Sequence, residues 1–143
     1  KGSQLVRWTI DVTAGKVSSQ VLSTVDQEFP RVDPRVECHP HQYGYALEVG
    51  GPHGFKGLLK HDLNSGVSLH HDVGENCAAG EPVFVPTGAA EDAGYILTVV
   101  YDGATKLSEV RIIDAQRFSA EPVAIIKLNA RVPFGFHGNF VTA

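Results

Sequence analysis

The chain has 143 residues, a length that suits one domain of ordinary size or a piece of a larger protein. Hydrophobic residues make up 43% and charged residues 20%, which excludes intrinsic disorder of the whole chain. The net charge is −4 and the basic residues are scattered, so we expect no nucleic-acid partner. The longest apolar runs are far shorter than the roughly 20 residues that a membrane span requires.

The start of the chain and its two cysteines also bear on its origin. Lys1 is followed by polar residues, and the chain contains no methionine. We therefore expect a cut or processed start and no secretory signal peptide. Cys38 and Cys77 cannot form a disulfide framework. One bridge is the alternative, but two free thiols in a cytoplasmic protein are the better expectation.

The distribution of apolar residues predicts an all-β fold. Short segments rich in Val, Ile, Leu and Tyr alternate with clusters of Gly, Pro, Asp and Asn. No window keeps a 3.6-residue apolar period over the length of a helix. The small, polar segment 88–94 predicts a loop or one short turn. In chain order, strands are predicted over residues 6–11, 17–22, 43–49, 57–62, 67–71, 82–85, 94–101, 109–114 and 123–128.

An internal repeat lies within this pattern. Three apolar strands each end in an aspartate and are followed by a short turn and a second strand. These aspartates, Asp11, Asp62 and Asp114, are 51 and 52 positions apart. A carboxylate at this place can accept turn N–H groups, and Gly15 and Gly66 can supply left-handed backbone. The third unit lacks the glycine, so we expect a different turn there.

A repeat of this length in an all-β chain is typical of propeller blades with four strands each. Propellers close with roughly four to eight blades, so a chain with fewer than three blades would be incomplete. The alternative is that strand, aspartate, turn and strand form a common hairpin whose spacing is a coincidence.

Seven histidines are the main chemical resource of the chain. None lies in an HExxH, CxxC or paired Cys/His motif, so no local zinc site is predicted. His39 and His41 are expected in a solvated loop, and His61 on a solvated strand face. His137 differs because glycines and aromatic residues surround it, a suitable setting for a metal ligand in an apolar cavity. Taken alone, a buried structural histidine is the better interpretation.

Three glutamates stand out by their context. Glu28 precedes Phe-Pro, Glu81 precedes a proline, and Glu91 comes just before the most apolar strand. On local sequence alone, each is better interpreted as a surface or turn carboxylate. The chain contains no nucleophile elbow, phosphate loop or dinucleotide fingerprint.

Seven short stretches, taken together, form a more specific pattern than any of them alone. They are EFPRVDPR (28–35), YGY (43–45), LKHD (59–62), GEPVFVP (80–86), EDAGYILTVVYD (91–102), IDA (113–115) and VPFGFHGN (132–139). In this order, over nearly the whole chain, they resemble the C-terminal part of the carotenoid cleavage oxygenase family. That family includes apocarotenoid and lignostilbene dioxygenases and the isomerase of the retinal pigment epithelium.

The resemblance implies a seven-bladed β-propeller, of which residues 1–143 would form roughly the last two to three blades. Family members hold a non-haem Fe(II) on the propeller axis through four histidines. The resemblance implies that His137 is the last of these ligands and that the other three lie upstream. It also implies that Glu28 and Glu91 hydrogen-bond iron-binding histidines, which would fix their tautomer and orientation.

The implied activity is cleavage of a conjugated C=C bond by O₂ to two carbonyl products. Carotenoids, apocarotenoids and stilbenes are the implied substrates, and we expect Phe134 and Phe136 to line an apolar tunnel. This chain alone is expected to be inactive, because one ligand cannot hold Fe(II) tightly. Further implied partners are the rest of the propeller or a second chain at exposed strand edges. The full-length protein is expected in the cytoplasm, with peripheral membrane attachment as an option.

Two other classes of function remain open on the sequence. The first is a non-catalytic, truncated propeller segment that acts by binding or strand pairing. The second is a separate small β-sandwich or barrel. Substrate identity and the choice between cleavage and isomerisation are also left open.

Overall fold

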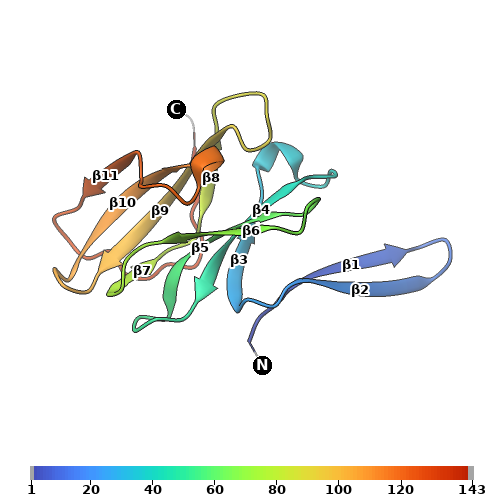
Figure 1. Ribbon diagram of the computed structural model, residues 1–143, viewed down its shortest axis with the longest axis horizontal. Coiled ribbons are helices and arrows are strands. Elements are labelled where there is room, and N and C mark those ends of the chain that lie inside the picture. Colours follow the sequence, from blue (N-terminus) through green and yellow to red (C-terminus); the bar gives the residue numbers. More distant parts are fainter. Residues whose placement is uncertain (1, 142–143) are drawn as a thin grey trace.

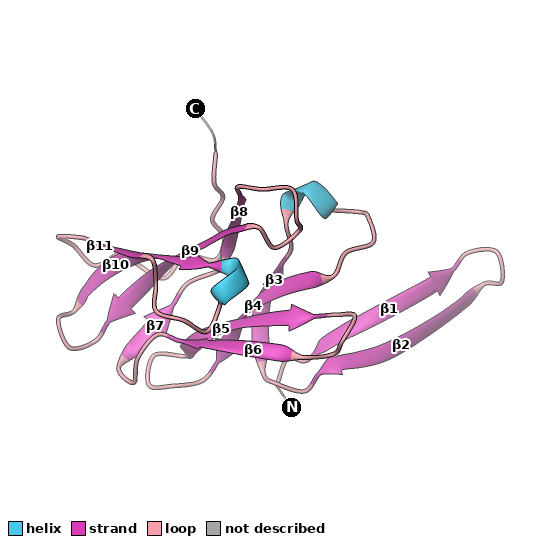
Figure 2. Ribbon diagram, turned by 45° about the horizontal axis from the view of Figure 1, so that its top comes forward, coloured by secondary structure: helices cyan, strands magenta, loops and turns pink. Residues whose placement is uncertain are grey.

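The protein is built from three antiparallel sheets (Figures 1 and 2). The computed structural model describes residues 2–141. The first sheet is a hairpin of β1 (Leu5–Asp11) and β2 (Lys16–Ser23). The second contains, in spatial order, β3 (Gln27–Arg31), β4 (Tyr43–Val49), β5 (Phe55–Asp62) and β6 (Ser68–Asp72). The third contains β7 (Cys77–Ala79), β8 (Val83–Pro86), β9 (Gly94–Asp102), β10 (Leu107–Asp114) and β11 (Ala124–Lys127).

Strand β9 organises the third sheet. It pairs along one edge with β7 and β8 in succession, and along the other with β10, which in turn pairs with β11. Within residues 2–141 the helical segments are the 3₁₀ turns η1 (Pro34–Val36) and η2 (Ala115–Arg117). Neither has the length or apolar character needed to cross a membrane.

All nine predicted strands are present, with ends shifted by a few residues, and two further strands were not predicted. Strand β3 was missed because it contains a proline, and β7 because it consists of three small residues. Both cysteines are free, as expected.

The three repeat aspartates occupy equivalent turns. In each turn Oδ1 accepts hydrogen bonds from the backbone N–H groups two and three positions further on, at 2.8–3.4 Å. Gly15 and Gly66 have φ values of 63° and 75°, as the turns after Asp11 and Asp62 require. After Asp114 the 3₁₀ turn η2 replaces the glycine turn. Strands β1, β5 and β10 are therefore equivalent positions of one repeated unit.

The hydrophobic core lies between the two larger sheets. The Tyr45 ring of β4 stacks on Phe84 of β8 with 5.6 Å between ring centroids. The buried cluster is composed of Tyr45, Leu47, Leu58, Val73, Ala79, Phe84, Ile96, Val100, Ile113, Ala115 and Phe118. All these residues follow the β1–β2 hairpin in the chain, and the hairpin projects away from the two larger sheets (Figure 1).

A buried lysine also joins these two sheets. Lys60 of β5 is 5% exposed, and its Nζ donates to Asp92 Oδ2 at 2.8 Å and to the Ala115 carbonyl at 2.7 Å. The ammonium lies over the Tyr43 ring, 4.2 Å from its centroid. Because both polar partners come from the third sheet or its connections, the charge is compensated only when the sheets are docked.

Candidate functional site

The segment after β11 carries His137 back across the sheets to a carboxylate. His137 Nδ1 lies 3.1 Å from Glu81 Oε1, and the Gly138 amide donates to Glu81 Oε2 at 2.8 Å. Because a carboxylate can only accept, the proton of the neutral imidazole lies on Nδ1, and Nε2 of that form carries the lone pair. Within residues 2–141 no hydrogen-bond partner occupies Nε2. A neutral imidazole fixed in this way is suited to bind a metal through Nε2.

Aromatic rings border His137 on one side. The Phe29 ring meets it edge to face, with 5.6 Å between centroids, and Phe136 lies 6.3 Å from Phe29. The His137 side chain is nevertheless 70% exposed. The alternative of a buried structural histidine is therefore wrong. Within residues 2–141, apolar groups cover one side of the His137 ring, and its other side is open.

The two glutamates predicted to support iron-binding histidines lie elsewhere. Glu28 is exposed and accepts a hydrogen bond from Ser3 Oγ. Glu91 accepts from the backbone amides of Gln42 and Tyr43, at 2.7–3.0 Å. Among the described residues neither is hydrogen-bonded to a histidine. Their role toward histidines upstream stays a prediction.

The other histidines form no second site. No group of three or more His, Cys, Asp or Glu side chains placed to hold a metal ion occurs within residues 2–141. His39 and His41 are exposed, as expected. The prediction for His61 was wrong, because its side chain is 4% exposed. Its Nδ1 lies 2.7 Å from Ser68 Oγ, and its Nε2 lies 2.7 Å from Gln27 Oε1. Burial lowers the pKa of His61.

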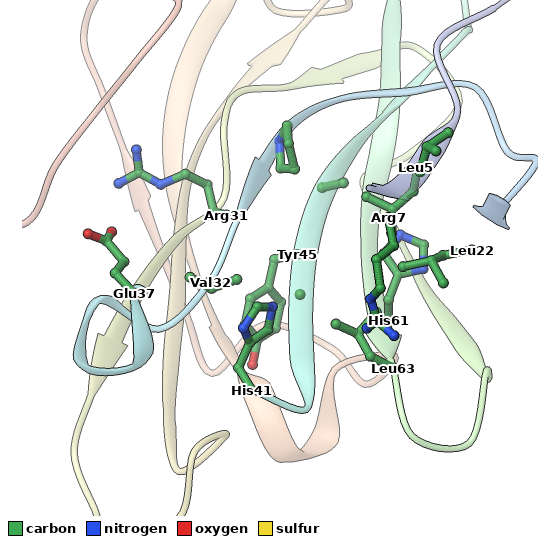
Figure 3. Close-up of a pocket in the computed structure, with 14 residues that line it drawn as sticks. Leu5, Arg7, Leu22, Arg31, Val32, Glu37, His41, Tyr45, His61 and Leu63 are labelled. Carbon is green, nitrogen blue, oxygen red and sulfur yellow. The ribbon is translucent and has the colours of Figure 1, made fainter. Parts of the chain in front are cut away.

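Two pockets differ in their relation to His137. The larger, of about 490 Å³, lies between the β1–β2 hairpin and the second sheet, with Leu22 and His61 in its wall (Figure 3). The smaller, of about 350 Å³, lies under the C-terminal segment and is lined by Glu81, Phe136 and His137 among others. Phe134 is half-exposed and borders only a minor hollow of about 40 Å³. The smaller pocket is therefore the one adjacent to the candidate ligand.

Three residues of the site were not assigned from the sequence. Glu81 was noted for its context but was interpreted as a surface or turn carboxylate; its side chain is 5% exposed. Phe29 carried no separate hypothesis, and neither did Arg31, whose Nη1 lies 3.4 Å from Glu81 Oε1. The signal that could have found Glu81 is its place in the GEPVFVP stretch, one of the seven family-like motifs.

The chain matches a known family over almost its full length. The profile described as "RPE65: Retinal pigment epithelial membrane protein" matches residues 1–142. The chain belongs to this family. Among members of the RPE65 family, the apocarotenoid-15,15'-oxygenase of Synechocystis is 37% identical in an alignment of 142 positions that covers 96% of this chain and 29% of that protein. The carotenoid 9,10(9',10')-cleavage dioxygenase 1 of Pisum sativum is 33% identical over 98% of this chain and 29% of its own length.

Solved structures of the RPE65 family share the fold. The cobalt-substituted Synechocystis oxygenase superposes with a TM-score of 0.93 at 35% identity, covering 99% of this chain and 31% of that one. A chimera of this oxygenase with RPE65 gives a TM-score of 0.93 at 31% identity. These are propeller enzymes, so the predicted all-β propeller segment is confirmed. The chain spans about 29–31% of the length of these relatives.

Proposed function

We propose that this chain is part of a non-haem Fe(II) dioxygenase that cleaves a conjugated C=C bond of a carotenoid, apocarotenoid or stilbene-type substrate into two carbonyl products. The general reaction is that of its relatives, which are carotenoid and apocarotenoid cleavage enzymes. The observation that carries the proposal to this chain is the Glu81–His137 pair, which leaves Nε2 free to bind a metal.

The residues present fit an iron ligand and the group that orients it. His137 would bind Fe(II) through Nε2, and Glu81 holds the proton on Nδ1 and the ring in place. Iron, when bound, supplies the redox chemistry that lets O₂ react with a conjugated C=C bond. The described residues hold no larger group of metal ligands, so the remaining ligands must come from outside them.

The surroundings of His137 favour an apolar substrate. Phe29 borders the ring of the candidate ligand, and Phe136 packs against Phe29 and lines the pocket of about 350 Å³ beside His137. Apolar and aromatic walls are what a polyene or stilbene requires. Phe136, in the wall of this pocket, and Phe134, in the wall of the neighbouring hollow, are therefore proposed to line the substrate path.

The experiment compares His137→Ala with wild type in the full-length enzyme. We expect wild type to bind iron and to convert an apocarotenoid, under ¹⁸O₂, into two carbonyl products that both carry the label. His137→Ala should lose bound iron and turnover while keeping its circular dichroism spectrum. Full iron content and full turnover in this variant would overturn the assignment of His137. Wild type that cleaves neither an apocarotenoid nor a stilbene would overturn the function.

One observation favours a second candidate, a module that acts by strand pairing. In the repeat, β5 pairs with β4 and β6, and β10 pairs with β9 and β11, whereas the equivalent β1 has β2 as its single partner among residues 2–141. One face of the hairpin carries Trp8 and Ile10, which are 66% and 67% exposed. The free edge of β1 is thus suited to a further strand, from the rest of a propeller or from a second chain.

The two candidates predict different behaviour of the 143-residue chain. Alone it has one candidate ligand, so we expect no retained iron and no turnover under the first proposal. A defined oligomer without iron, from a full-length protein that also lacks iron, would instead support the strand-pairing module. Sedimentation equilibrium and metal analysis of both samples distinguish these outcomes.

A further inference from the structure

The last residue of β3 connects three parts of the molecule. Arg31 Nη1 lies 3.4 Å from Glu81 Oε1. Its Nη2 donates to the Gly138 carbonyl at 3.3 Å and to Asn139 Oδ1 at 2.8 Å. Arg31 therefore joins the second sheet both to Glu81 and to the residues that follow His137.

A bulge in β3 brings Arg31 to this position. Glu28 pairs with Leu47, and Arg31 pairs with Tyr45, so β3 contains one more residue than β4 between these pairs. Within the bulge Phe29 has φ of 52°, a left-handed conformation that costs a bulky residue about 1–3 kcal/mol. The ring of Phe29 reaches His137, and Figure 3 shows the Arg31 guanidinium pointing away from Leu22.

The C-terminal segment depends on few polar contacts. From residue 134 to residue 141 it forms no strand, and its four side-chain hydrogen bonds to the rest of the described chain all end on Arg31 or Glu81. Glu81 accepts two of these bonds, and its carboxylate lies beside the Arg31 guanidinium. Removing Arg31 would thus take away two bonds directly and leave Glu81 without its cationic neighbour.

We propose that Arg31 is a positioning residue for the candidate metal ligand. It fastens the segment 134–141 to the second sheet and thereby holds His137 beside Glu81. A guanidinium suits this task because its planar fork donates to several acceptors at once, which an ammonium group cannot do in the same geometry. This inference rests on the proposed function for the role of His137 toward iron, whereas the fastening itself is independent of any metal.

The test uses Arg31→Met and Arg31→Lys in the full-length protein, with Arg35→Met as the matched control. Arg35 also joins the two larger sheets. It pairs with Asp33, just after β3, and donates to the carbonyls of Gly88 and Ala90 between β8 and β9. It has no hydrogen bond to the described part of the C-terminal segment. Hydrogen exchange of the peptide containing Gly138 is measured without metal, and the affinity for Co(II) is measured separately.

We expect Arg31→Met to speed exchange of the hydrogen-bonded Gly138 amide by about tenfold and to raise the Kd for Co(II) roughly 10- to 100-fold. Arg31→Lys should recover part of both effects, and Arg35→Met should leave exchange in this segment unchanged. Wild-type exchange and affinity in Arg31→Met, or equal effects of Arg35→Met, would overturn the inference. If wild type binds no metal, the proposed function fails, and the exchange measurement still decides whether Arg31 fastens the segment.

Discussion

Replacing Glu81 with glutamine tests whether one carboxylate holds the candidate ligand. Glu81 is 5% exposed and accepts from His137 Nδ1 and from the Gly138 amide with its two oxygens. Glutamine has the same shape but only one acceptor oxygen. If its NH₂ group faces the Gly138 N–H, that hydrogen bond is lost; if it faces His137 Nδ1, the bond survives only when the imidazole proton moves to Nε2, which then no longer offers a lone pair to a metal. The negative charge beside Arg31 is lost as well.

The magnitude follows from these contacts. A hydrogen bond to a charged group contributes about 1.5–3 kcal/mol, and one between neutral groups about 0.5–1.5 kcal/mol. Because the His137 and Arg31 side chains are 70% and 29% exposed, solvent screens part of this difference. We expect Glu81→Gln to lower the free energy of unfolding by about 1–2 kcal/mol. We also expect metal affinity to fall roughly 10- to 100-fold, because the imidazole loses its orienting partner.

A matched control separates these effects from the general loss of a carboxylate. Glu48 also lies between a cation and an imidazole, with Lys56 Nζ at 2.8 Å and His70 Nε2 at 2.7 Å, but on β4. Co(II) titration and urea unfolding are carried out on wild type, Glu81→Gln and Glu48→Gln in the full-length protein. Glu48→Gln should keep wild-type Co(II) affinity. Unchanged affinity in Glu81→Gln, or an equal loss in Glu48→Gln, would refute the reasoning.

Three further predictions concern stability and association. Burial lowers the pKa of His61 and of His71. As the pH falls, these two histidines are therefore protonated in the unfolded chain at a higher pH than in the folded chain. Stability should be full above about pH 6.5 and fall below it, by at most about 1.4 kcal/mol per pH unit for each histidine, as urea midpoints between pH 7.5 and 5 can show. Leu58→Ala, at a fully buried position of β5, should cost about 2–5 kcal/mol in the same assay; a loss below 1 kcal/mol would contradict the docked core. Trp8→Thr should change the stability of the 143-residue chain by less than about 0.5 kcal/mol but weaken its self-association in sedimentation, and unchanged association would argue against the open face of the hairpin.

The parts of the fold that depend on residues close together in the chain could be predicted from the sequence. Apolar alternation between turn residues located nine of the strands, and the spacing of Asp11, Asp62 and Asp114 gave the repeat, because each carboxylate caps its own turn. Strand β3 was not predictable in this way, since its bulge depends on pairing with β4. The error for His61 has the same origin, because its buried partner Gln27 lies on β3.

The candidate site depends on contacts between distant residues, and local context could not supply them. His137 was assigned through its motif, whereas its partner Glu81 lies 56 positions earlier, in the connection between β7 and β8. Glu91 has a similar motif context but accepts hydrogen bonds from the backbone amides of Gln42, just before β4, and of Tyr43, the first residue of β4. Which carboxylate meets which imidazole is decided by how the sheets dock, and Arg31 takes part for the same reason.

The position of His137 after the last strand has a consequence for synthesis of the protein. The ribosome delivers β1–β11, Glu81 and Arg31 before His137 emerges. A premature stop between Lys127 and His137 would therefore keep strands β1–β11 together with Glu81 and Arg31, but would remove the candidate ligand His137. Because chaperones and proteases act on unfolded chains, we expect such a truncation to reduce metal binding more than protein abundance.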